Sequence, residues 1–401
     1  MSAEPRYVVN RYAPRCLSLL AGICAAMPLP ASPLEQLPLP AGCKPAHRSA
    51  QASPVEAMDV SVFPPVQLDV RIPFEPSAFR AGGYRYLVYE LQLQNYSEAP
   101  LRVETLDILA PAPDGAELLL RVSGQALQDQ MKLVGSGADD SAQTLETGRA
   151  ATVFLCIAFD GSSQVPDRLL HRLLLDGAVA QGPEVGTQHD VVKVLSSPVH
   201  GSHWLADNGL ALDLHHRPGV FVAGGTARIS RRYAIDWKRR VDGKLLAGPS
   251  LDVRSYHAYG EPVFAVADAT VIQARDGFPD NIPRTPSGFT PAVPLSMESL
   301  AGNTVVLDLG DGQFAHYAHL QPGSIAVMAG QRVKRGEPLA NIGNSGDARW
   351  PHLHFQVSTG PDVMGSEGVP FVLDHFRAKG PSGQWTVRHQ EYPLLSSELD
   401  L

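Results

Sequence analysis

Two histidines in the segment PHLHFQV, residues 351–357, are the clearest candidates for chemistry in this chain. Residues i and i+2 of a β-strand point to the same side. We therefore expect His352 and His354 to project together, while Leu353 faces the opposite side. Imidazole is both a metal ligand and an acid–base group near neutral pH. The pair indicates a metal or acid–base site, and two surface histidines are the alternative interpretation.

An aspartate and a third histidine lie in two other apolar segments. In YAIDW, residues 233–237, alternation places the aromatic side chains in the core and Asp236 on the opposite face. The small Ala234 beside Asp236 leaves space for another group. His319 ends the segment YAH, and alternation puts it on the same face as Tyr317. Asp236 and His319 are therefore further candidates, and a solvent-facing aspartate and a surface histidine are the alternatives.

Four segments of the second half occur in an order that resembles a known family. They are GEPVFAVADATV, GNTVVLDLGDGQFAHYAHL, GQRVKRGEPLANIGNSG and PHLHFQV, and the similarity extends over residues 218–376. Together they resemble the lysostaphin-type zinc peptidases, also called LytM-like domains. That family holds zinc with a histidine, an aspartate four residues later and the second histidine of HxH. It cuts peptide bonds of bacterial cell-wall peptidoglycan.

The resemblance implies a role for each candidate residue. Asp236 and His354 correspond to zinc ligands, and His319 and His352 correspond to catalytic residues. A catalytic zinc takes about three protein ligands plus water. The metal activates that water and polarises the scissile carbonyl, while neutral histidine accepts a proton and histidinium donates one. The implied function is a zinc metalloendopeptidase that acts on peptidoglycan peptides.

One position departs from the family pattern. Arg232 stands four residues before Asp236, where the family has its first histidine ligand. Alternation points Arg232 toward the expected metal, yet arginine has no acceptor atom and stays protonated. Either His215 or His216 completes the site, with one of the two turned inward, or Arg232 pairs with Asp236 in place of zinc. In the second case the chain is a zinc-free relative that binds peptidoglycan or activates another hydrolase.

The elements that must position these residues divide the chain into two expected domains. Short alternating apolar runs over residues 60–198 predict a β-sandwich of immunoglobulin-like type. Residues 199–376 predict a small antiparallel β-barrel or folded sheet with glycine at its turns. Residues 31–59 are expected to be a Pro/Ala-rich linker, and residues 377–401 a C-terminal tail.

Composition agrees with a folded β-rich protein that does not bind nucleic acid. The chain has 401 residues, which favours two domains. Its 36 glycines and 34 prolines favour many turns and short strands over long helices. The formal net charge of −8, without a long basic run, argues against a nucleic-acid partner.

The N-terminal residues 1–30 resemble a secretory signal peptide. A basic region precedes an apolar stretch over residues 16–29, and small residues follow. The stretch is shorter than the roughly 20 residues that a membrane-spanning helix needs. We therefore expect export to the periplasm or cell envelope and no transmembrane span in the mature chain. The mature chain keeps Cys43 and Cys156, and an oxidising compartment permits a disulfide between them.

Overall fold

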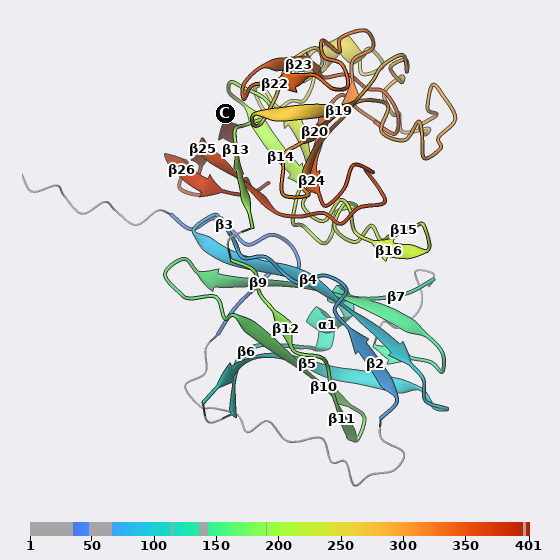
Figure 1. The fold of residues 1–401 in the computed structure, drawn as a ribbon, viewed down its shortest axis with the longest axis vertical. Helices are drawn as coiled ribbons and strands as arrows, with labels where there is room; N and C mark the ends of the chain where they lie inside the picture. Colours follow the sequence, from blue (N-terminus) through green and yellow to red (C-terminus); the bar gives the residue numbers. More distant parts are fainter. Residues whose placement is uncertain (1–34, 48–65, 114, 136–142, 190, 396–397) are drawn as a thin grey trace, which may run out of the picture. The chain divides into compact units, whose positions relative to one another are not determined.

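The structure is a computed structural model that describes residues 35–47, 66–113, 115–135, 143–189, 191–395 and 398–401 (Figure 1). The expected signal peptide, residues 1–30, lies outside the described residues. Glu35–Leu401 forms one compact unit. Within the described ranges, no helix is both long and apolar enough to cross a bilayer.

Two six-stranded sheets enclose an apolar core in the first half of the chain. The first sheet contains β1 Lys44–Pro45, β2 Leu68–Arg71, β3 Phe79–Ala81, β4 Tyr84–Asn95, β7 Met131–Leu133 and β9 Ala150–Asp160. The second contains β5 Leu101–Ala112, β6 Gly115–Ser123, β8 Thr144–Leu145, β10 Arg168–Leu175, β11 Ala178–Gln181 and β12 Val185–Gly186. Helix α1, Gly124–Gln130, follows β6. Figure 1 shows the two sheets as separate layers.

An eleven-stranded sheet carries the second half of the described chain. Its members are β13 Lys193–Leu195, β14 Trp204–Asn208, β17 Ile235–Arg239, β19 Ala269–Arg275, β20 Asn303–Asp308, β21 Phe314–Leu320, β22 Arg332–Val333, β24 Leu353–Ser358, β25 Phe371–Lys379, β26 Trp385–Glu391 and β27 Leu399–Asp400. All pairs are antiparallel except β13 with β25. Residues 377–401, expected to be a tail, contain β26 and β27, and β27 pairs with β14 and β25.

Smaller elements complete this half. They are the β15–β16 pair, Phe221–Ala223 and Thr226–Arg228, the β18–β23 pair, Pro262–Phe264 and Pro338–Asn341, and a 3-10 turn at Val253–Ser255. The prediction of a mainly β fold is confirmed. The immunoglobulin-like topology of the first half stays a prediction.

Two segments of the second half show how its apolar runs form strands. Residues 302–320 form the hairpin β20–β21, with Asp311 in the left-handed region between two glycines. Residues 260–272 contain β18 and the first part of β19. The chain bends between them because β18 pairs with β23, whereas β19 pairs with β20 and β22. Residues 276–302 form a long loop between β19 and β20.

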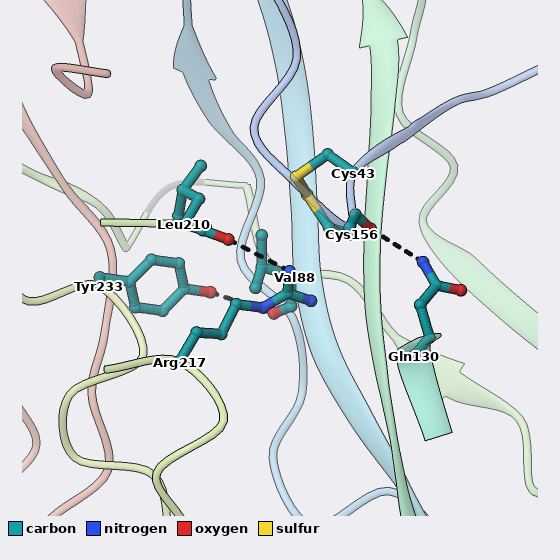
Figure 2. Close-up of a disulfide and its surroundings, with 8 residues drawn as sticks. Cys43, Val88, Gln130, Cys156, Leu210, Arg217 and Tyr233 are labelled. Carbon is teal, nitrogen blue, oxygen red and sulfur yellow. Dashed lines mark hydrogen bonds between the residues drawn. A yellow bond between two sulfur atoms is a disulfide. The ribbon is translucent and has the colours of Figure 1, made fainter. Parts of the chain in front are cut away.

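The described part of the expected linker is held against the first sheet. Cys43 and Cys156 form a disulfide between chain positions 113 residues apart (Figure 2). β1 follows Cys43 directly and pairs in parallel with β9, the strand that contains Cys156. In the same region, the Tyr233 hydroxyl donates to the backbone carbonyl of Val88 in β4 at 3.1 Å. This bond links the segment before β17 to the first sheet.

Candidate metal and catalytic centre

Asp236 and His354 lie opposite each other on neighbouring strands. Antiparallel pairing of β17 with β24 sets Asp236 directly across from His354, and the Asp236 Oδ1 to His354 Nδ1 distance is 3.0 Å. The Asn208 amide at the end of β14 donates to the other carboxylate oxygen, Oδ2, at 2.7 Å. The carboxylate is therefore fixed by Asn208 on one side and presents Oδ1 to the pocket.

His352 and His319 approach the same carboxylate from the ends of two strands. His352 precedes β24, and its Nε2 lies 3.4 Å from Asp236 Oδ1. The ring centroids of His319 and His352 are 5.0 Å apart. Both histidines line one pocket with Asp236 and His354. The pocket therefore contains every site residue that the resemblance implied.

His319 reaches the pocket through an unusual backbone conformation. Strand alternation predicted that His319 and Tyr317 share a face, and this prediction is wrong. Tyr317 is fully buried in the core, where its hydroxyl accepts from Val266 N–H. His319 has a φ of 64°, which is left-handed and disfavoured for a residue with a side chain. This reversal at the strand end turns the imidazole to the pocket, and such strained positions are concentrated at functional sites.

His216 occupies the place that the sequence pattern left vacant. Its Nε2 lies 3.4 Å from Asp236 Oδ1, and its ring centroid is 4.9 Å from that of His354. His216 is buried, whereas the adjacent His215 is exposed at the pocket rim. Ligand atoms of His215, His216 and Asp236 all lie within 4.8 Å of one another. The structure thus brings both histidines near Asp236, with His216 the inner one.

Hydrogen bonds fix which nitrogen of three rings carries the proton. The Nδ1 atoms of His216, His319 and His352 lie 3.0, 2.8 and 2.7 Å from backbone carbonyl oxygens. A carbonyl oxygen only accepts, so each Nδ1 must donate. In the neutral ring, Nε2 then carries a lone pair. Neighbouring oxygens commonly orient metal-binding histidines in this way.

His354 is oriented in the opposite sense. The Gln356 amide nitrogen donates to the Val363 carbonyl, so the Gln356 carbonyl oxygen faces His354 Nε2 at 2.9 Å. His354 Nε2 must donate to that oxygen, and the neutral ring has its lone pair at Nδ1. Two acceptors, Nδ1 and Asp236 Oδ1, then lie 3.0 Å apart. A proton or a metal ion between them removes their mutual repulsion.

Burial and mutual contact set the charges of the site. Burial raises the pKa of Asp236, but the His216 and His352 rings outweigh it and hold that pKa well below the usual value. Burial lowers the pKa of His216 and of His319 well below their usual value. At neutral pH, Asp236 is therefore a carboxylate and His216 is a neutral imidazole, which are forms that bind a metal.

Arg232 lies outside this centre, contrary to the expectation that it points toward the metal. Its guanidinium donates to both oxygens of Glu90 at 2.8–3.1 Å, to Glu367 at 3.0 Å and to the Gly368 carbonyl at 2.9 Å. Alternation failed here because β17 begins only at Ile235 and residue 232 belongs to a turn. Arg232 is 1% exposed and joins β4 of the first sheet to the second half.

A second hollow lies beside the pocket along the sheet. Ala301, Ala318 and Val363 line both hollows. The second hollow has a volume of about 480 Å³ and extends over β19, β20 and β21. The long loop of residues 276–302 contributes Leu300 to the first hollow and Met297 to the second.

Sequence reasoning missed two residues of this centre. Asn208 and Gln356 orient Asp236 and His354, but neither belongs to the motif positions that drew attention. The sequence could have indicated Gln356, because it follows His354 by two positions and residues two apart on a strand share a face. No comparable signal existed for Asn208, which meets Asp236 only through the pairing of β14 with β17.

Comparison with known proteins gives matches to part of the chain. Residues 251–364 match the profile of peptidase family M23. Peptidoglycan DD-endopeptidase ShyA of Vibrio cholerae is 31% identical over 130 residues, which is 32% of this chain and 27% of ShyA. Cell division protein DipM of Caulobacter vibrioides is 40% identical over 62 residues, 16% of this chain and 10% of DipM. The chain thus spans well under two thirds of either relative.

The M23 catalytic domain of EnpA from Enterococcus faecalis is a structural match. It is 18% identical, with a TM-score of 0.26, and the match covers 43% of this chain and 93% of that domain. The M23 profile region, residues 251–364, contains His319, His352 and His354 but begins after Asp236 and His216.

Proposed function

We propose, from the premise that residues 251–364 form a domain of peptidase family M23, that this protein is an exported zinc metalloendopeptidase. Its substrate is the peptide portion of peptidoglycan. His216, Asp236 and His354 are the proposed zinc ligands, and His319 and His352 are the proposed catalytic residues. His215 is exposed at the pocket rim and is not a proposed ligand, so its substitution is the control for that of His216.

The observation that carries this proposal is the arrangement of lone pairs around Asp236 Oδ1. His354 Nδ1 lies 3.0 Å from that oxygen, and the Nε2 atoms of His216 and His352 lie 3.4 Å from it. Each nitrogen is an acceptor because the other nitrogen of its ring faces a protein oxygen. Nitrogen and carboxylate donors are those that zinc prefers in catalytic sites. The residues present therefore fit the metal.

The chain's own residues account for the proton movements of amide hydrolysis. Bound zinc supplies Lewis-acid chemistry that polarises a carbonyl and lowers the pKa of water. Neutral His319 or His352 accepts a proton from the attacking water at Nε2, whose lone pair is set by the Nδ1 bond. The water oxygen bonds to the carbonyl carbon, the C–N bond breaks, and the protonated imidazole returns the proton to the leaving amine.

The alternative function was a zinc-free peptidoglycan-binding module or hydrolase activator. It rested on Arg232 replacing a metal ligand and pairing with Asp236. Arg232 pairs instead with Glu90 and Glu367, while His216 lies beside Asp236. We therefore favour the enzyme, and the binding module becomes the outcome to expect if no metal is bound.

Three observations support the proposed substrate and location. The relative ShyA is a peptidoglycan DD-endopeptidase by name. The second hollow, over β19–β21, shares lining residues with the site pocket and offers space for further residues of a peptide substrate. The Cys43–Cys156 disulfide is of the kind that persists in oxidising compartments such as the periplasm. The signal peptide expected from the sequence agrees with this location, and we infer export on these grounds together.

Digestion of purified peptidoglycan tests the proposal. We expect the zinc-loaded protein to release soluble peptide fragments, identified by mass spectrometry, and a chelator to stop their release. His352→Ala removes a proposed catalytic imidazole and should abolish release. His375→Ala, which changes an exposed histidine of β25, should leave it unchanged. A zinc-loaded wild-type chain that releases nothing, under conditions where a known endopeptidase does, contradicts the proposal.

A further inference from the structure

Arg231 is a guanidinium without a partner in the wall of the site pocket. It lines the same hollow as Asp236 and His216. Its Nε atom is shielded from solvent and makes no hydrogen bond. Within the described ranges, Arg231 makes no side-chain hydrogen bond or ion pair, and the Asp236 and Asp347 carboxylates act on its charge only from a longer distance. Burial is the main influence that lowers the pKa of Arg231.

The other cations of the pocket already have carboxylate partners. Lys238 pairs with Asp207, and Arg349 lies 3.0 Å from Asp347. Of the cations that line this hollow in the described chain, Arg231 alone lacks such a partner. A partly buried guanidinium without an acceptor is costly, because its lost hydration is not replaced. The arrangement therefore indicates that Arg231 binds an anionic group of a ligand.

The loop that carries His216 makes room for this guanidinium. Gly219 has no side chain, and a Cβ added there would lie 2.8 Å from Arg231 Nη2 and 3.0 Å from the backbone oxygens of His215 and His216. Arg231 thus lies against the same short loop that places His216 beside Asp236. Its charge is held at a fixed place relative to the proposed zinc ligands.

We propose that Arg231 binds a free carboxylate of the substrate within about two residues of the scissile amide. An arginine fork recognises a carboxylate with two parallel charge-assisted hydrogen bonds. The location in the same hollow as Asp236 and His354 places that carboxylate next to the bond that is cut. The preferred substrate class is then an acidic peptide, and converting that carboxyl to a carboxamide removes the interaction. This inference rests on the proposed function for the position of the scissile bond.

Cleavage of a matched substrate pair tests the inference. One cross-linked muropeptide has free carboxyl groups beside the cross-link, and the other has them as primary carboxamides. We expect the wild-type chain to prefer the free acid by about 10- to 100-fold in kcat/KM, the range for a charge-assisted bond. Arg231→Gln should reduce the preference to about one, whereas Arg240→Gln, at an exposed position, should keep it. Equal wild-type rates on the two substrates would overturn the inference.

Binding of the cleaved products separates this inference from the proposed function. Calorimetry measures wild type, Arg231→Gln and Arg231→Lys with the free-acid and the amidated product peptide. Preferential binding of the acid that Arg231→Gln abolishes and Arg231→Lys retains in part supports the inference, even if the chain cleaves nothing. Cleavage of both substrates without any preference in rate or binding overturns the inference and leaves the proposed function standing.

Discussion

Arg232→His restores the residue that the family has at this position, and we predict that it destabilises the fold without creating a metal ligand. The substitution removes a guanidinium that donates to Glu90, Glu367 and the Gly368 carbonyl. Glu90 is 1% exposed and Glu367 is 7% exposed, so two carboxylates lose their buried counterion. Removing one partner of a buried ion pair costs about 3–5 kcal/mol.

Urea unfolding at neutral pH measures the loss in the free energy of unfolding. Zinc titration measures whether Arg232→His creates a metal ligand. Arg240→His makes the same replacement at an exposed position and should leave the free energy of unfolding nearly unchanged. Combining Arg232→Met with Glu90→Gln should cost less than the sum of the single changes, because one uncompensated carboxylate disappears. An Arg232→His chain that is as stable as wild type and binds zinc more tightly would refute the placement of Arg232.

Three further predictions concern other contacts. Asn208→Ala should weaken zinc binding about 10- to 100-fold, because Asp236 loses the amide that orients it; unchanged affinity in competition with a chelator would contradict this. Replacing Cys43 and Cys156 by serine should lower the free energy of unfolding by about 2–5 kcal/mol, and equal urea midpoints would exclude it. Burial lowers the pKa of His171 to about 4 from 6.5, so the unfolded chain binds the proton more readily and stability is lost as pH falls through this window. From about pH 7 to about pH 5 the loss due to this group is about 2 kcal/mol, and His171→Asn should remove that part of the pH dependence.

Local patterns in the sequence were sufficient where a residue's position depends on one strand. The HxH spacing and the alternation in YAIDW predicted that His352, His354 and Asp236 are site residues, and all three line one pocket. Alternation failed at His319, where a left-handed backbone reverses the side chain. It failed at Arg232 because the strand begins three residues later. A periodicity argument holds only inside the element, and the ends of elements are where these two residues lie.

Contacts between distant segments could not be predicted from one sequence. His216 is an inner residue because its Nδ1 meets the Ala234 carbonyl, and nothing in the adjacent pair of histidines distinguishes the two. Glu90 lies in β4, 142 positions from Arg232, and no local pattern links them. The pairing of Cys43 with Cys156 was permitted by composition, but only the fold brings their Cα atoms to 4.5 Å.

The zinc content of three purified chains tests the central claim most directly. Elemental analysis after dialysis compares wild type with His216→Ala and His215→Ala, two changes at adjacent positions of one loop. We expect about one zinc per chain in wild type and in His215→Ala, and none in His216→Ala, since a catalytic zinc needs about three protein ligands. A His216→Ala chain that keeps its zinc, or a wild-type chain that binds none when zinc is supplied, would contradict the assignment of His216 as the third ligand.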